Sequence, residues 1–153
     1  MGWQQSRVGA AVNRFFIIRM KNRVLVKLQS LFMAPPVYVQ VFRNRFVVSL
    51  LASGVRVEGT GDFSHPRMLI GKFQAAEQLL RQLLQEAYEE AHGKSVFPQR
   101  PLVVVHPKEV LEGGLTDIEE RVLMEMALGA GARRVKVWQG DDLRVETMAA
   151  VTF

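Results

Sequence analysis

Apolar and polar positions are arranged most clearly in the last third of the chain. Residues 101–107 form an apolar run without alternation, which is typical of a strand buried on both faces. Thr116 and Glu119 then carry the sequence signature of a capping box at the start of a helix. Glycines at 129 and 131 mark the helix end, and residues 134–138 predict a second strand. We therefore expect a β-α-β unit with a right-handed crossover.

The preceding residues predict a meander of three strands and a long helix. Pro35-Pro36 opens this region, and apolar runs at 37–42 and 46–51 are joined by a short turn in which Asn44 is suited to positive φ. Residues 55–58 predict a third strand. Residues 68–92 carry a wide apolar stripe at helical spacing, and Gly93 follows as a helix stop. The predicted order, β-β-β-α-β-α-β in a mixed α/β sheet, is that of the ribonuclease-H-like fold.

Residues 1–34 form a separate arm in this interpretation, followed by a domain at 35–143 and a segment at 144–153 that forms a last helical turn or a tail. The arm reads as a basic amphipathic helix that can lie in a membrane interface. The other interpretations are a helix packed on the domain and a disordered tail. Met20 offers an alternative translation start. The residues expected to contact a membrane are Phe15, Ile18, Arg19, Lys21, Arg23, Lys27, Leu28, Leu31 and Phe32.

The charge distribution supports this division of the chain. The 153 residues carry a net charge of +5, but residues 1–57 contain nine basic side chains and no acidic one. The remaining 11 basic and 15 acidic residues give 11 − 15 = −4. We therefore expect the arm to meet an anionic surface. The chain has no cysteine, so disulfides and thiolate metal sites are excluded, and no apolar run reaches the ~18 residues of a spanning helix.

The segment from residue 101 to residue 140 resembles bacterial MreB and its actin-like relatives. In that family a strand ending in Val-Pro is followed by a Thr-x-x-Glu-Arg helix start and by Ala-Gly-Ala-Arg before the next strand. Here the strand ends in His106-Pro107, while Thr116, Glu119, Arg121 and Gly131-Ala132-Arg133 fit. The resemblance extends over about residues 20–140 and corresponds to the family's first subdomain, one half of an actin-like ATPase. It implies a bacterial cytoplasmic protein, peripheral at the inner membrane face and linked to cell shape or envelope machinery.

The residues expected at the nucleotide site depart from that family. Its Asp-Leu-Gly-Thr phosphate turn is matched by Gln40, Val41, Phe42 and Arg43. The side chain of Phe42 would prevent the close backbone approach that glycine allows, and an amide replaces the carboxylate. A ribonuclease-H-type nuclease needs several carboxylates around two metal ions, but strand 37–42 has none and Glu77 supplies only one. We expect no catalysis, cofactor or metal.

One small pocket is suggested by position. His106 ends a parallel strand, where open α/β sheets bind ligands, and Arg43 and Lys108 could join it in an anion pocket. The favoured alternative is a partly buried, hydrogen-bonded histidine, because no nucleophile or acid stands at a defined spacing from it. His65 and His92 read as a loop residue and a helix-end cation.

These observations predict a non-catalytic, MreB-like protein that binds a protein partner or forms a homo-oligomer, and that associates with an anionic membrane surface. Two alternatives from other classes stay open. One is a small-ligand or nucleotide-binding enzyme domain that uses the pocket near His106. The other is a basic nucleic-acid-binding protein, which the clustering of aromatic with aliphatic residues in the arm disfavours.

Overall fold

The computed structural model describes residues 35–93, 100–109, 112–148 and 150–153. The chain divides into two units, residues 1–34 and Pro35–Phe153. All nine residues expected to contact a membrane belong to the first unit and lie outside the described residues. Within the described part of the chain, no helix has both the length and the apolar character needed to cross a membrane.

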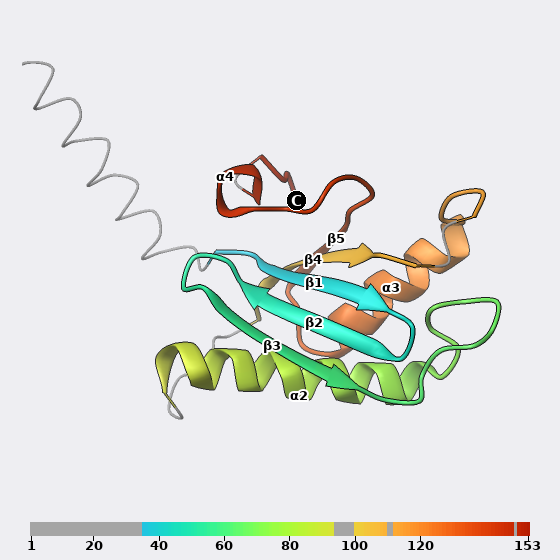
Figure 1. Cartoon of the computed structure of the whole chain (residues 1–153), viewed down its shortest axis with the longest axis horizontal. Coiled ribbons are helices and arrows are strands. Elements are labelled where there is room, and N and C mark those ends of the chain that lie inside the picture. The colour runs from blue at the N-terminus through green and yellow to red at the C-terminus, as the bar shows by residue number, and fades with distance from the viewer. Residues whose placement is uncertain (1–34, 94–99, 110–111, 149) are drawn as a thin grey trace, which may run out of the picture. The chain divides into compact units, whose positions relative to one another are not determined.

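The second unit is built on a five-stranded mixed sheet in the order β3-β2-β1-β4-β5 (Figure 1). Strands β1 (Val37–Phe42), β2 (Arg45–Leu50) and β3 (Val55–Thr60) form an antiparallel meander. Strand β4 (Leu102–Pro107) pairs in parallel with β1, and β5 (Arg134–Val137) pairs in parallel with β4. The α/β class, the element order and the mixed sheet predicted from the sequence are therefore confirmed.

Two helices cover one face of this sheet. Helix α2 (Phe73–His92) packs on β2 and β3, and α3 (Asp117–Gly129) packs on β4 and β5. The main core lies between these helices and the side chains that alternate toward them from the strands. Its largest fully buried members include Phe46, Phe63, Leu80, Leu84, Leu123 and Met126.

The opposite face is covered by the C-terminal segment. Tyr38 and Val104 point to this face and pack with Leu143 and Met148 in a second apolar cluster, which Val151 and Phe153 also contact. The short helix α4 (Val145–Met148) belongs to this segment, which is drawn in red over the sheet in Figure 1. The C-terminal end therefore includes a helical turn at Val145–Met148, which was one of the two alternatives predicted for this segment.

Local signals from the sequence account for several element ends. The capping box at Thr116 and Glu119 is present, and Asn44 has φ 52° in the turn between β1 and β2. Gly93 at the end of α2 and Gly131 after α3 also have positive φ, the conformation for which glycine is favoured at helix ends. These four local predictions are confirmed.

The start of α2 was predicted wrongly. The helix begins at Phe73 rather than at residue 68, because the residues before it form a folded loop. In this loop the backbone N–H groups of Gly71 and Lys72 both donate to the carbonyl of Phe63. A Cβ at Gly71 would lie 2.6 Å from the Cβ of His65, so the loop closes only around a glycine. Leu69 and Ile70 are buried here and belong to the main core, although they lie outside the helix.

Candidate functional site

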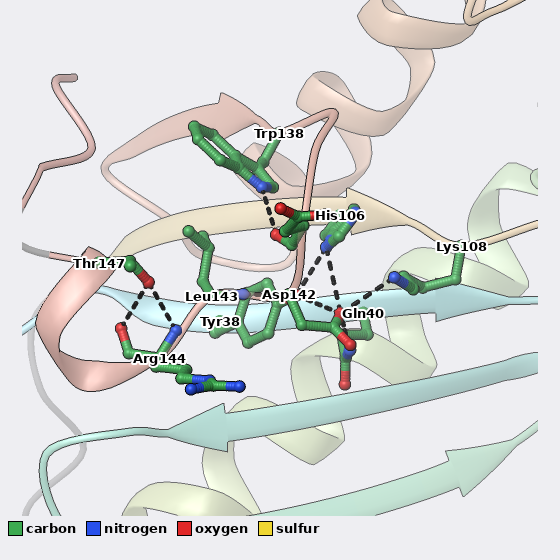
Figure 2. Close-up of polar contacts among 10 residues, drawn as sticks. Tyr38, Gln40, His106, Lys108, Trp138, Asp142, Leu143, Arg144 and Thr147 are labelled. Atoms are coloured by element: carbon green, nitrogen blue, oxygen red, sulfur yellow. Dashed lines mark hydrogen bonds and ion pairs between the residues drawn. The ribbon is translucent and has the colours of Figure 1, made fainter.

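Five polar side chains meet on the sheet face opposite α2 and α3 (Figure 2). We call them the Asp142 cluster: Tyr38, Gln40, His106, Lys108 and Asp142. The Asp142 Oδ1 atom accepts hydrogen bonds from Nε2 of Gln40 at 3.0 Å, Nζ of Lys108 at 3.0 Å and the hydroxyl of Tyr38 at 3.2 Å. One carboxylate oxygen therefore binds two side chains of β1 and the lysine that follows β4.

Strand geometry places four of these residues together. Successive side chains in a strand point to opposite faces, so Tyr38 and Gln40 point away from the helices while Val37, Val39 and Val41 enter the main core. In the parallel pairing of β1 with β4, Gln40 lies opposite His106. The backbone N–H of Lys108 donates to the carbonyl of Val41, which continues this pairing and brings the lysine beside the histidine.

Asp142 reaches the cluster from the segment that follows β5. We call residues 138–148 the strap. The strap is ordered by its own polar contacts: Nε1 of Trp138 donates to the carbonyl of Asp141, and Oγ1 of Thr147 accepts from the backbone N–H of Arg144. Leu143 adds an apolar contact with the second cluster. The carboxylate of Asp142 thus fastens the strap to the sheet.

Burial favours the neutral form of His106. Its side chain is 3 % exposed, and desolvation followed by repulsion from Lys108 lowers its pKa below 6.5, against smaller raising effects from Asp142 and from a hydrogen bond to the backbone of Gly140. The Tyr38 hydroxyl lies 2.6 Å from Nδ1 of this ring. An Nδ1 without a proton can accept from the hydroxyl, so the neutral ring fits its surroundings.

The surroundings also set the charge states of Tyr38 and Asp142. Burial is the largest of the effects that raise the pKa of Tyr38 to about 12. The hydrogen bond from Lys108 is the largest of the effects that lower the pKa of the Asp142 carboxyl below its usual value. The phenol therefore stays protonated and the carboxylate stays ionised. In these charge states both groups take part in the hydrogen bonds of the cluster.

The structure brings together only part of the predicted anion pocket. His106 and Lys108 both approach Asp142, with Nδ1 of His106 at 3.8 Å from its carboxylate. The guanidinium of Arg43 instead donates to the carbonyls of His65 and Pro66. The positive charge of Lys108 thus faces an acidic side chain of the same chain. Tyr38 and Asp142 were missed, because a tyrosine in an apolar strand and an aspartate in a loop give no signal of long-range pairing.

A second candidate surface lies at the carboxyl ends of β1 and β4, where the loop before α2 and the loop before α3 are on the same side of the sheet (Figure 1). We call it the α3 face. It includes a polar cleft of about 730 Å³ lined by Arg43, Pro66, Arg67, Glu109, Glu112, Gly114, Thr116 and Glu119. Next to the cleft is an apolar depression of about 30 Å³ lined by Met68, Leu69, Ile70, Leu115, Ile118, Glu119, Val122 and Leu123. Glu119 lines both, so the cleft and the depression adjoin at this residue.

The remaining sequence candidates have ordinary surroundings. Glu77 forms an ion pair with Arg81 on the surface of α2 at 2.8 Å, and His65 accepts a hydrogen bond from the backbone N–H of Arg67. The ring of His92 is tilted against Tyr88 at the end of α2. Across the described ranges, no group of three or more histidine, aspartate or glutamate side chains is arranged to hold a metal ion.

Comparison with known proteins identifies one clear relative. No family model matches the chain. The chain is 37 % identical over 94 residues to a protein from Escherichia coli (strain K12) named "Uncharacterized protein YjaA". The match covers 61 % of this chain and 74 % of the E. coli protein, so it spans most of the relative. The name of the relative states no activity, substrate or partner.

Proposed function

We propose that this chain, which belongs to the YjaA family, is a non-catalytic protein-binding domain with a ribonuclease-H-like fold. Family membership rests on the sequence identity, whereas the fold family and the function are inferred from the arrangement of residues. The proposal also links the protein to MreB and its actin-like relatives, through the motif at Thr116, Glu119 and Arg121.

The strand order supports the fold family. An antiparallel meander β1-β2-β3 is extended by β4 and β5, both parallel to β1, in the order β3-β2-β1-β4-β5. Helix α2 links β3 to β4, and α3 links β4 to β5. This is the arrangement expected for a ribonuclease-H-like domain or one half of an actin-like ATPase. A shared fold does not bring the activity with it, because activity depends on the residues of the site.

The observation that carries the non-catalytic proposal is the hydrogen bond from Gln40 to Asp142. Gln40 stands on β1 at the position where the actin-like pattern calls for an aspartate, and its amide donates to Asp142 at 3.0 Å. That carboxylate also faces the ammonium group of Lys108 at 3.0 Å. A metal ion at this point would compete with a lysine for a single acidic group. The cluster is therefore suited to holding the strap rather than to holding metal and phosphate.

Protein binding is supported by the α3 face. Ile118 is 75 % exposed and Met68 is 39 % exposed, and both border the apolar depression. Single exposed apolar side chains are common on proteins, but an apolar hollow rimmed by charged groups is typical of an interaction site. The charged rim is provided by the adjoining cleft with its arginine and glutamate side chains.

Isothermal titration calorimetry of the full chain with ATP and magnesium tests the non-catalytic part. The proposal predicts no saturable heat, and the same result for Gln40→Ala. Micromolar binding that requires magnesium would overturn it and would favour the alternative of a nucleotide-binding enzyme domain. An assay of RNA and DNA cleavage with magnesium or manganese extends the test to nuclease chemistry.

Membrane association through the arm is a separate part of the proposal, supported by the charge pattern of residues 1–34. Each Lys or Arg adds up to about 1 kcal/mol near an anionic leaflet, and the apolar residues at 15, 18, 28, 31 and 32 would add insertion. The full chain should sediment with anionic liposomes but not with neutral ones. The double variant Lys21→Glu/Arg23→Glu should lose this binding, and equal sedimentation of the two proteins would contradict it.

A further inference from the structure

The α3 face carries a projecting apolar side chain beside an apolar hollow. Ile118 occupies the first turn of α3 and has the greatest exposure among the large apolar side chains that the structure describes. Ile118 lines one edge of a depression of about 30 Å³, which is also lined by Met68, Leu69, Ile70, Leu115, Glu119, Val122 and Leu123. This volume admits the tip of one aliphatic side chain. A projection and a hollow of matching chemistry therefore lie side by side on one surface.

A surface of this kind is complementary to its own copy. In a dimer with two-fold symmetry both subunits use the same patch. If a residue of the first copy contacts a site on the second, the same residue of the second copy contacts the same site on the first. We propose that the chain forms a two-fold symmetric dimer through the α3 face, with Ile118 of each copy entering the depression of the other. This inference rests on the proposed protein-binding function and specifies its partner as a second copy of the chain.

The charged side chains beside the depression are also complementary to those of a second copy. Arg67 and Glu112 are both exposed and line the same cleft, yet neither has an ion-pair partner among the described residues. Glu119 is less available, because its carboxylate accepts from both the backbone N–H and the hydroxyl of Thr116. A two-fold rotation can bring Arg67 of one copy to Glu112 of the other. The cleft then contributes two equivalent ion pairs around the apolar contact.

Sedimentation equilibrium of the full chain tests the apolar contact. The wild type should approach twice its 17.3 kDa mass across the micromolar range. Ile118→Glu places a charge in the depression of the other copy and should weaken association at least about tenfold. The side chain is exposed in the single chain, so the variant should fold, which circular dichroism can check. Val145→Glu is the matched control, because Val145 is 54 % exposed on α4 and the variant should associate like the wild type.

Three outcomes decide this experiment. A wild type that remains monomeric across the range overturns the dimer. Equal association of the wild type and Ile118→Glu also overturns it, because the contact then lies elsewhere. Loss of association in Ile118→Glu but not in Val145→Glu supports it. Failure here leaves the non-catalytic proposal intact, because that proposal is tested by nucleotide binding.

Charge exchange tests the symmetry. Arg67→Glu and Glu112→Arg should each associate more weakly than the wild type, because like charges then face each other at both ends of the interface. A mixture of the two variants should recover heterodimers, since each copy now presents the complement of the other. Recovery supports the two-fold pairing of Arg67 with Glu112, and a mixture that associates no better than the separate variants overturns that pairing.

Discussion

The hydroxyl of Tyr38 on β1 lies 2.6 Å from Nδ1 of His106 on β4, within the buried part of the sheet. The same hydroxyl is 3.4 Å from the backbone N–H of Leu143, which donates to it, and 3.2 Å from Oδ1 of Asp142. A phenol carries a single proton. It therefore donates either to the neutral histidine or to the aspartate, and a proton added to His106 would shift the phenol proton toward Asp142. This side chain connects both strands to the strap.

Tyr38→Phe should destabilise the fold by about 1–3 kcal/mol, because it removes the partner of a buried ring nitrogen and of a strap amide. Urea unfolding of the wild type, Tyr38→Phe, His106→Leu and the double variant provides a double-mutant cycle. The cycle should show a coupling free energy above about 0.5 kcal/mol. The effects of substitutions at sites that do not interact add to within about that amount. Additive effects would mean that the 2.6 Å contact contributes nothing specific.

Stability should fall on acidification through the range in which histidine titrates. The pKa of His106 in the folded chain is lowered from 6.5, chiefly by burial and then by Lys108. At a pH between the folded-state and the unfolded-state pKa of His106, the unfolded chain therefore binds a proton more readily than the folded chain. The free energy of unfolding rises with pH in this range. The contribution of His106 is fully present above about pH 6.5 and is lost as pH falls toward its folded-state pKa.

Urea midpoints measured from mildly acidic to neutral pH, with His106→Gln as the comparison, test this pH dependence. The wild type should lose stability as pH falls through the window, whereas the variant should show a shallower dependence because the buried titrating group is gone. Parallel curves for the two proteins would mean that His106 is not the source of the pH dependence.

Asp142→Ala should loosen the strap without disturbing the helices. The variant removes the acceptor for Gln40, Lys108 and Tyr38, so amide hydrogen exchange at Leu143 and Met148 should accelerate while α2 remains protected. Asp141→Ala is a matched control, since the contact made by Asp141 in the strap uses its backbone carbonyl. If exchange in the strap were the same in both variants, the carboxylate of Asp142 would not be what fastens it.

Two substitutions test the elements from which the fold was predicted. Thr116→Ala removes the side chain that accepts from the backbone N–H of Glu119 and should cost about 1 kcal/mol.

Val104→Ala creates a cavity in β4, where Val104 is fully buried, and should cost roughly 2 kcal/mol or more. Urea unfolding measures both, and a neutral Val104→Ala would contradict tight packing between the sheet and the strap.

Local patterns in the sequence were sufficient to predict most elements. The unbroken apolar run of β4, the capping box at Thr116 and the turn at Asn44 each depend on neighbouring residues alone, and each occurs in the structure. The loop before α2 could not be predicted in this way. Two of its apolar residues, Leu69 and Ile70, are buried in the main core with residues of α3, and an apolar stripe alone does not distinguish such a loop from a helical turn.

The candidate sites depend on register and topology, which explains why the sequence revealed only parts of them. His106 and Lys108 were selected by their position at a strand end, and they do lie together. Asp142 is separated from Tyr38 by 104 residues, and only the return of the chain over the second sheet face brings them into contact. Helical spacing alone does not show that Ile118 is exposed at the edge of a hollow.

The most direct test of dimerisation through the α3 face uses the absence of cysteine from the chain. Arg121→Cys places a thiol one helical turn after Ile118, and Val145→Cys places one on α4 as the control. Each purified full-length variant would be treated with a short bismaleimide and analysed by denaturing electrophoresis. The account predicts a covalent dimer for the variant at position 121 and little for the variant at position 145. Equal cross-linking at both positions, or none at position 121, would contradict it.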